Sequence, residues 1–189
     1  IPAPYWVSYP DITLLAEGVP IIIKCSEENQ FKITPKQLEE KITSKTKWLF
    51  LNSPNNPTGS TYTYKELEGL ARILIKYPHV MILSDDIYEK IIYEDQKFYT
   101  IAQIEPRLKS QTLTLNGVSK AYCMTGWRLG YAGGPRDIIS GINKIQSQST
   151  TSTSSISMAA AVEALNGDQN FIEKHNLAFK KRRDMVVEK

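Results

Sequence analysis

The sequence predicts an α/β fold, with a mostly parallel sheet and helices on both of its faces. Two observations lead to this prediction. Short runs of β-branched and apolar residues alternate along the 189 residues with amphipathic stretches, a pattern typical of strands joined by helices. Hydrophobic residues make up 41% of the chain and charged residues 23%, the balance of a globular domain large enough to form its own core.

The first predicted strand is the compact β-branched run of residues 19–25. A helix should follow it and end near Ile42. Thr34 and Gln37 have the spacing of a capping box, in which each side chain bonds the other residue's backbone N–H, and Pro35 suits the first helical turn.

A second capping box, Thr63 with Glu66, opens the next predicted helix. Its apolar residues recur on one face, and we expect it to end near Tyr77, before Pro78. Three apolar runs around it are predicted as strands of the sheet: 48–51, 80–83 and 112–115.

The last third of the chain begins with a predicted strand over residues 128–132. Pro135 then opens a helix that runs to about Gln148. The segment 147–157 is dense in Ser and Thr, so we predict a loop that hydrogen-bonds locally.

Two further helices are expected at the end. The first covers residues 158–165 and stops at Gly167, and Asp168 caps the second. Residues 185–189 still have helical character without a stop signal, and the chain opens on Ile1 with no secretion signal. We therefore expect a piece of a longer protein.

Composition excludes several classes of function. The net charge of +3 is too small to indicate nucleic-acid binding, because the excess comes largely from residues 180–183, which we interpret as a solvated helix face. No apolar run approaches membrane-spanning length, so no membrane segment is predicted. Cys25 and Cys123 are expected to be free thiols in the cytoplasm. The two histidines and two cysteines are scattered, so we predict no metal site.

Polar residues follow three of the predicted strands. They lie at residues 55–59, at Asp85 with Tyr88, and at Ser119 with Lys120. Because the carboxyl ends of neighbouring parallel strands open on one crevice, where ligands bind, we expect these groups to converge. The glycines of residues 130–134 lack the spacing and the following acidic residue of a dinucleotide site, which excludes a nicotinamide cofactor.

These strand ends resemble the motifs of a known family. Residues 117–130, GVSKAYCMTGWRLG, resemble the Schiff-base lysine motif of the class I aminotransferases, which use pyridoxal 5'-phosphate. Residues 55–59, NNPTG, match that family's cofactor-binding turn, and residues 84–88, SDDIY, match its pyridine-binding strand end. With residues 4–9, PYWVSY, the likeness covers nearly the whole chain and looks similar to the bacterial aspartate/prephenate aminotransferase subgroup.

The resemblance assigns chemistry to particular residues. It implies that Lys120 holds the cofactor's aldehyde and later moves protons as the catalytic base. Asp85 is then the carboxylate that keeps the pyridine nitrogen protonated, so that the ring can withdraw electrons. Asn56 and Tyr88 are implied to hydrogen-bond the cofactor's phenolic oxygen. Asp86 stands where a Glu is more usual, and we expect it to have a supporting role.

Three further residues complete the implied cofactor site. Arg128 corresponds to the arginine that grips the phosphate, and Ser119 adds a hydroxyl donor. Trp6 corresponds to the aromatic residue that stacks on the pyridine ring. The chain departs from the family at Gly117, where many members have a phosphate-binding serine, and at Cys123. We expect Gly117 to weaken the phosphate site while offering its backbone N–H.

The function implied by the resemblance is transfer of an amino group between an amino acid, aspartate being the first candidate, and a 2-oxo acid. Residues 1–189 would be the central part of the pyridoxal-phosphate-binding large domain, without its N-terminal segment and without the C-terminal small domain. The isolated chain should then be weakly active or inactive. Family members are homodimers, and the segment from Ser147 is expected to approach the partner's cofactor.

Two other functions remain open from the sequence. A pyridoxal-phosphate β-lyase that cleaves a C–S bond would use the same Lys120, Asp85 and Tyr88. A non-catalytic remnant that serves as a binding or assembly module would keep the fold and lose the chemistry. The amino-acid pair cannot be assigned, because the residues that bind the substrate carboxylate are expected to lie outside the chain.

Overall fold

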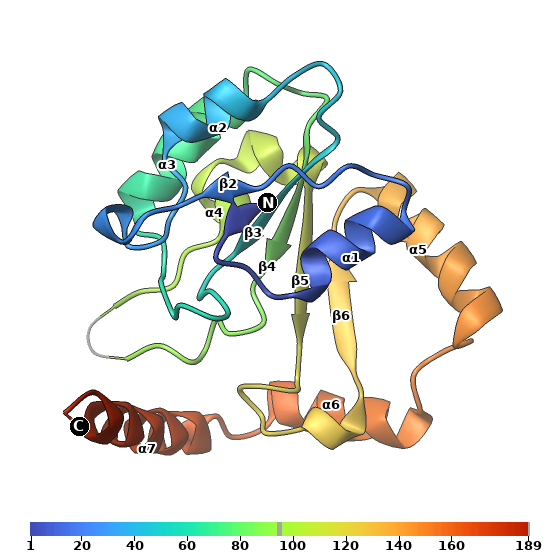
Figure 1. Cartoon of the computed structure of the whole chain (residues 1–189). Helices are drawn as coiled ribbons and strands as arrows, with labels where there is room; N and C mark the ends of the chain where they lie inside the picture. Colours follow the sequence, from blue (N-terminus) through green and yellow to red (C-terminus); the bar gives the residue numbers. More distant parts are fainter. Residues whose placement is uncertain (94–95, 189) are drawn as a thin grey trace.

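The computed structural model describes residues 1–93 and 96–188 and has the predicted α/β architecture (Figure 1). A four-stranded sheet forms its centre, with strand order β3-β4-β5-β6. The first three strands are parallel, and β6 pairs antiparallel with β5. The four strands are β3 (Trp48–Asn52), β4 (Met81–Asp85), β5 (Thr112–Gly117) and β6 (Gly130–Gly133). A small parallel sheet pairs β1 (Pro2–Ala3) with β2 (Ile23–Lys24).

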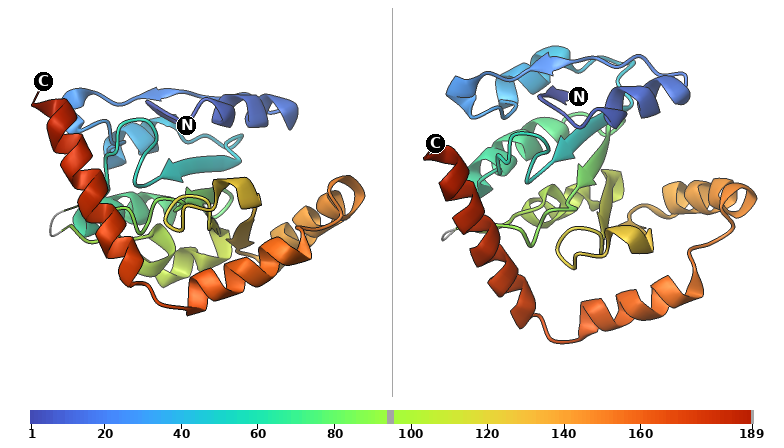
Figure 2. Two further views of the ribbon diagram at one scale, coloured as in Figure 1. Left: turned by 90° about the horizontal axis from the view of Figure 1, so that it is seen from below. Right: turned by 60° about the horizontal axis from the view of Figure 1, so that its bottom comes forward.

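Helices surround the sheet unevenly. In Figure 1, α2, α3 and α4 gather beside β3 and β4, whereas α5, α6 and α7 follow one another along the periphery, as Figure 2 also shows. The α-helices are α1 (Ser8–Leu15), α2 (Pro35–Lys41), α3 (Tyr64–Leu74), α4 (Ile101–Ile104), α5 (Arg136–Ser149), α6 (Ser155–Asn166) and α7 (Asn170–Val187). The short 3-10 helices are η1 (Glu27–Asn29), η2 (Pro106–Gln111) and η3 (Thr125–Trp127).

Two apolar clusters hold the fold together. The larger joins α2, α3, α4 and η2 to the sheet, and its Leu70, Leu74 and Ile82 are fully buried. The smaller packs Val118 and Tyr122, which flank Lys120, against residues of α6 and α7. The segment after β5 is therefore anchored by burial of apolar side chains on both sides of the lysine.

Both predicted capping boxes are confirmed. Thr34 and Gln37 bond each other's backbone N–H at the start of α2, and Thr63 and Glu66 do so at the start of α3. The second helix is shorter than predicted, because its hydrogen bonding changes after Ile75. The backbone N–H groups of Lys76 and Tyr77 bond carbonyls three residues back, which tightens the chain before β4.

Two predicted strands are shorter in the structure. The run 19–25 forms a strand only at Ile23–Lys24, because β1 offers it a partner of two residues, and Val19 is 80% exposed. The strand expected from residue 128 begins at Gly130. Arg128 has the left-handed φ of 51°, which ends η3 and cannot continue as extended backbone.

The Ser/Thr-rich segment is more helical than predicted. The loop expected over residues 147–157 is limited to residues 150–154, because α5 continues through Ser149 and α6 starts at Ser155. The hydroxyl of Ser149 donates to the Ile145 carbonyl at 3.1 Å, so its hydrogen bond is formed within helix α5.

At the end of α6, Gly167 is the C-cap, as predicted. The assignment of Asp168 as cap of the last helix is wrong, since Gln169 is the N-cap residue of α7. Asp168 lies directly before the N-cap residue and accepts a hydrogen bond from the Asn170 backbone N–H at 2.9 Å. Lys189 lies outside the described residues.

Other expectations concern the surface. Residues 181–183 are exposed, as expected for a solvated helix face, and Arg183 in addition lies over the Tyr93 ring at 5.2 Å. Both cysteines are free thiols, Cys25 buried and Cys123 exposed. Over the described residues, no helix combines the length and the apolar character needed to cross a membrane.

Candidate functional site

Asp85 is the last residue of β4, and three polar contacts fix it. The Tyr9 hydroxyl donates to Asp85 Oδ2 at 2.6 Å, and the Ile87 backbone N–H donates to Oδ1 at 3.3 Å. The Asn52 side chain donates to the Asp85 carbonyl at 2.9 Å, as their pairing in the sheet register allows. Both carboxylate oxygens of Asp85 thus accept hydrogen bonds that fix the orientation of the side chain.

Tyr9 reaches this carboxylate from α1. Its side chain is 4% exposed and packs edge-on against Trp6 and Phe50, with ring centroids 5.6 and 5.4 Å apart. Burial first, and then the Asp85 carboxylate, raise the pKa of Tyr9 well above its usual value. The phenol is therefore a permanent donor to Asp85. Trp6 itself is 42% exposed, so one end of this aromatic row is open to solvent.

The turn after β3 is tied to Asp85 through Asn52. Besides its bond to Asp85, Asn52 accepts the Asn56 backbone N–H at 2.8 Å. Asn55 shapes the turn by accepting from the backbone N–H and hydroxyl of Thr58, and Gly59 has the left-handed φ of 72° that a side chain would disfavour. Within the described chain the Asn56 side chain makes no hydrogen bond, so its amide is available to a ligand.

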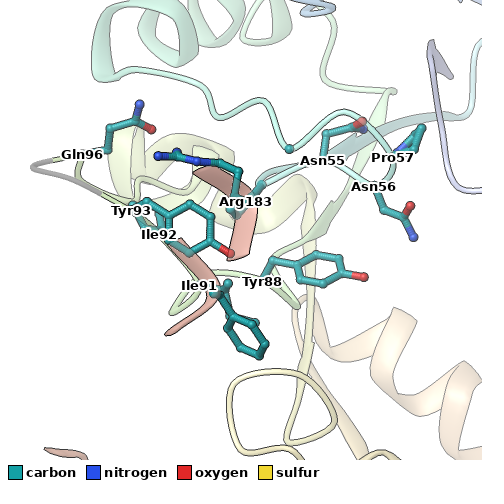
Figure 3. Close-up of a pocket in the computed structure, with 12 residues that line it drawn as sticks. Asn55, Asn56, Pro57, Tyr88, Ile91, Ile92, Tyr93, Gln96 and Arg183 are labelled. Carbon is teal, nitrogen blue, oxygen red and sulfur yellow. The ribbon is translucent and has the colours of Figure 1, made fainter. Parts of the chain in front are cut away.

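Asn56 and Tyr88 line a single cavity of about 450 Å³ (Figure 3). In Figure 3 the Asn56 amide and the Tyr88 hydroxyl extend toward the same end of it. The cavity is bounded by the turn after β3, the segment after β4 and helix α7. Its other lining residues are Pro54, Asn55, Pro57, Gly59, Ile91, Ile92, Tyr93, Gln96, Phe179 and Arg183.

Lys120 adjoins this cavity without lining it. Its Nζ lies over the Tyr88 ring, 5.6 Å from the centroid, at a distance where a cation is attracted to an aromatic face. The lysine is half-buried, and in the part of the chain that the structure describes its amine forms no hydrogen bond or ion pair. The sheet thus brings together Lys120, Tyr88, Asn56 and Asp85, from three different strand ends.

Ser119 and Arg128 are not drawn into this group. Arg128 is exposed, and its Nη1 donates to the Thr125 carbonyl at 2.8 Å. No hydrogen bond among the described residues joins it to Ser119 or Lys120. The predicted phosphate residues are therefore near the lysine in sequence, but no hydrogen bond within the described part of the chain links them to it.

Gly117 differs from its expected behaviour. Its backbone N–H is not available, because it donates to the Asn116 side-chain oxygen at 2.7 Å. A Cβ at this position would meet the Leu129 carbonyl oxygen at 3.0 Å and Gly130 Cα at 3.1 Å. The glycine therefore allows β5 and β6 to approach closely where the lysine segment begins.

Asp86 points to the other face of β4 from Asp85. It is 4% exposed and accepts the Ser84 hydroxyl at 2.8 Å. Burial raises the pKa of Asp86 to about 7, although hydrogen bonds from Ser84 and Thr100 offset part of that rise. It is a buried carboxyl group beside the site, and not a surface residue.

Tyr9 and Asn52 were not predicted as site residues. Asn52 carried a usable signal, because it is a polar residue at the carboxyl end of an apolar strand, as Asp85 is. Tyr9 lies in the segment 4–9 that resembles the family, but α1 has one buried residue and no apolar periodicity, so nothing there marks Tyr9 as a partner of Asp85. Across the described residues there is no group of three or more His, Cys, Asp or Glu side chains that could hold a metal ion.

Comparison with known proteins gives one consistent result. The family model "Aminotransferase class I and II" matches residues 1–189. Relatives include the "Probable aspartate/prephenate aminotransferase" of Rickettsia felis, 55% identical over 99% of this chain and 46% of its own length. The "Aspartate/prephenate aminotransferase" of Cereibacter sphaeroides is 56% identical over 99% of this chain and 47% of its own length.

Solved structures agree. The aspartate aminotransferase of Rhizobium meliloti superposes with a TM-score of 0.97 at 51% identity, covering 99% of this chain and 47% of its own. That of Thermus thermophilus, solved with maleate, has a TM-score of 0.93 at 40% identity, covering 98% and 48%. The chain spans about half the length of the curated relatives it matches.

Proposed function

This chain belongs to the class I and II aminotransferase family, and on that premise we propose that it binds pyridoxal 5'-phosphate for transfer of an amino group between an amino acid and a 2-oxo acid. Aspartate is the first candidate donor, because these relatives and solved structures are named aspartate or aspartate/prephenate aminotransferases. The observation that carries the proposal is the convergence of Lys120, Tyr88 and Asn56 beside Asp85.

The residues present suit such a cofactor in chemical type. The site combines a carboxylate held by two donors, an amide, a phenol and an amine that, among residues 1–93 and 96–188, makes no hydrogen bond or ion pair. When bound, pyridoxal phosphate supplies an electron-withdrawing ring to the substrate's α-carbon. We assign Lys120 the covalent attachment of that group and the transfer of the proton at the α-carbon.

Asp85 would keep a pyridine nitrogen protonated. Its carboxylate is suited to this because hydrogen bonds from the Tyr9 hydroxyl and the Ile87 N–H hold its two oxygens and so fix the orientation of the group. Asn56 and Tyr88 would donate to an ionised phenolic oxygen from their shared cavity. A group held at one end by a carboxylate and at the other by these donors would have a single orientation.

Three residues would bind the remaining parts. Arg128 and Ser119 would hold the phosphate, which requires the Arg128 guanidinium to leave its bond to the Thr125 carbonyl. Trp6, at the open end of the aromatic row, would cover one face of the ring. The proposed phosphate-binding residues are therefore the ones that would have to rearrange most on binding.

The remaining proposals concern the whole protein. We assign residues 1–189 to part of the pyridoxal-phosphate-binding large domain of a cytoplasmic homodimer with no nucleic-acid or membrane partner. Two facts support a partial domain with surfaces that other parts of the protein or a second subunit cover: the chain spans about half of its relatives' length, and large apolar side chains such as Leu15 and Val162 are exposed at 87% and 61%. The isolated chain should have weak activity at most.

An activity test needs a complete framework. A chimera in which these residues replace the matching segment of the Rhizobium meliloti enzyme, 51% identical, supplies one. We expect it to convert aspartate and 2-oxoglutarate to oxaloacetate and glutamate, and Lys120→Ala to lose at least about a hundredfold of that rate. Pyruvate and a thiol released from cystathionine, with no glutamate formed, would identify a β-lyase instead. Equal transamination rates for the chimera and its Lys120→Ala variant would favour the hypothesis of a non-catalytic module.

A further inference from the structure

Asp86 is a buried acidic group that the proposed chemistry does not use. Its side chain is 4% exposed and lies on the same face of β4 as the buried Ser84, whereas Asp85 lies on the opposite face. The charged groups that raise its pKa, Glu89 and Asp85, are both acidic. A buried carboxylate surrounded in this way destabilises the folded chain.

The contacts of Asp86 are directed at one peptide. Its backbone N–H donates to the Leu115 carbonyl at 2.9 Å, so β5 holds one side of the peptide that joins Asp85 to Asp86. On the other side, the Asp85 carbonyl accepts from the Asn52 side chain at 2.9 Å and from the Ser53 N–H at 3.3 Å. The peptide is thus fixed between β3 and β5.

The Asp86 side chain adds a third anchor. It accepts from Ser84 at 2.8 Å and from the hydroxyl of Thr100, the N-cap residue of α4, and these two hydroxyls lie 3.3 Å apart. An ionised carboxylate can accept from both hydroxyls at once, while a protonated one gives up an acceptor position. The anchor is therefore strongest when Asp86 carries its charge.

We propose that Asp86 is a positioning residue: with Ser84 and Thr100 it locks the Asp85–Asp86 peptide and so directs the Asp85 carboxylate at the proposed site. The consequence for Asp85 follows from the strand geometry, since rotation of that peptide turns the Asp85 side chain away from Tyr9 and from the Ile87 N–H. The direction of Asp85 should then depend on the charge of Asp86. The role of Asp85 toward a cofactor rests on the proposed function, whereas its direction in the unliganded chain does not.

The Ile87 amide proton provides the direct measurement, because it is bonded to Asp85 Oδ1. In the 189-residue chain, its NMR chemical shift followed from pH 5.5 to 8.5 should show an inflection near pH 7, where Asp86 loses its proton. In Asp86→Asn the inflection should disappear, and the proton should stay at its low-pH position. Asp137→Asn, which neutralises an exposed acid on α5, should keep the inflection.

Two further readouts separate positioning from a structural role. At pH 8, Asp86→Asn should unfold at a higher urea concentration than the unsubstituted chain, because a buried charge has been removed. In the Rhizobium meliloti chimera, the same substitution should nevertheless weaken binding of pyridoxal phosphate about fivefold, the size expected for one lost hydrogen bond. A purely structural residue would move stability and binding in the same direction. Ser84→Ala, which keeps the carboxyl group, should weaken binding in the same sense.

An Ile87 amide shift that has no inflection, or whose inflection keeps its full size in Ser84→Ala, would overturn the proposal, because Ser84→Ala keeps the Asp86 charge and removes only its anchor. If the unsubstituted chimera bound no pyridoxal phosphate while the Ile87 inflection of the 189-residue chain behaved as expected, the proposed function would fail and the positioning of Asp85 would stand. If Asp86→Asn did not fold, Ser84→Ala and the unsubstituted chain would still decide between these outcomes.

Discussion

The hydroxyl of Tyr9 donates a 2.6 Å hydrogen bond to Asp85 although 76 residues separate them in the chain. This bond connects α1 to the carboxyl end of β4 and leaves the second carboxylate oxygen to the Ile87 N–H. Because Tyr9 also packs against Trp6 and Phe50, it joins the proposed ring-covering residue to the sheet. One buried phenol thus positions two groups of the proposed cofactor site.

Replacing Tyr9 by phenylalanine removes a charge-assisted hydrogen bond and leaves the packing in place. We expect Tyr9→Phe to lower the free energy of unfolding by about 2 kcal/mol in urea titrations at pH 7. Tyr5→Phe is the matched control, since the Tyr5 hydroxyl has no hydrogen bond among the described residues. Equal losses in the two variants would show that the Tyr9–Asp85 bond does not stabilise the fold.

In the ion pair between Lys32 and Glu66, the lysine is buried and the glutamate is partly exposed, with side chains 8% and 39% exposed. Lys32 also donates to the Thr61 carbonyl. Burial alone would raise the pKa of Glu66, but the hydrogen bonds from Lys32 and Thr63 outweigh burial and lower that pKa. We expect Glu66→Gln to destabilise the chain by about 2 kcal/mol, since it leaves a buried cation unpaired. Lys32→Met should cost less than about 1 kcal/mol, because it leaves Glu66 in contact with water. Urea unfolding of both variants at pH 7 tests the order, and the reverse order would contradict it.

The buried Asp86 gives the stability of the fold a definite pH dependence. Its pKa is about 7 in the folded chain and about 4 when unfolded, so the folded chain binds more protons between these values. Stability contributed by Asp86 is therefore full below about pH 4 and lost as pH rises through about 7, by at most about 4 kcal/mol. Glu66 and Glu105 have lowered pKa values, so their effects fall below this window.

Unfolding free energies of the unsubstituted chain and Asp86→Asn, measured at half-unit steps from pH 4.5 to 8, test this dependence. The difference between the two curves should fall steadily to about pH 7 and then level off. A constant difference over the whole range would mean that Asp86 does not carry a raised pKa.

A fourth stability test concerns Gly117. Gly117→Ser introduces the residue that many family members have, but its Cβ would press on the Leu129 carbonyl oxygen at 3.0 Å and on Gly130. We expect a loss of about 1–3 kcal/mol, the usual cost of an overpacked site, seen as a lower midpoint of thermal unfolding. Gly126→Ser, where a Cβ meets nothing within 4 Å, is the matched control. A stabilised Gly117→Ser would show that β6 shifts without cost.

The sequence predicts the fold best where local chemistry and tertiary contacts agree. The capping boxes at Thr34 and Thr63 form because their bonds lie within four residues. The parallel strands 48–51, 80–83 and 112–115 were found because a buried strand needs apolar residues on both faces. In contrast, residues 19–25 have the composition of a strand but obtain a two-residue partner, which no local pattern reveals.

In the candidate site, too, the residues set by local motifs could be predicted, whereas those set by tertiary contacts could not. Asp85, Asn56, Tyr88 and Lys120 meet because parallel strands place their carboxyl ends together, and the motif order indicated this in advance. Tyr9 could not be found, since its role depends on where α1 docks and not on its own sequence pattern. The position of Arg128, bonded to Thr125, depends on the left-handed backbone at residue 128, which sequence alone does not indicate for an arginine.

The central claim is that Lys120 is the covalent attachment point of pyridoxal phosphate. Borohydride reduction of the chain mixed with pyridoxal phosphate, followed by peptide mass mapping, tests it most directly, both in the 189-residue chain and in the Rhizobium meliloti chimera. We predict a stable pyridoxyl adduct on Lys120 in the chimera, and its absence in Lys120→Arg. A chimera that carries no adduct at Lys120, or carries it equally on exposed lysines such as Lys36 and Lys181, would contradict the account.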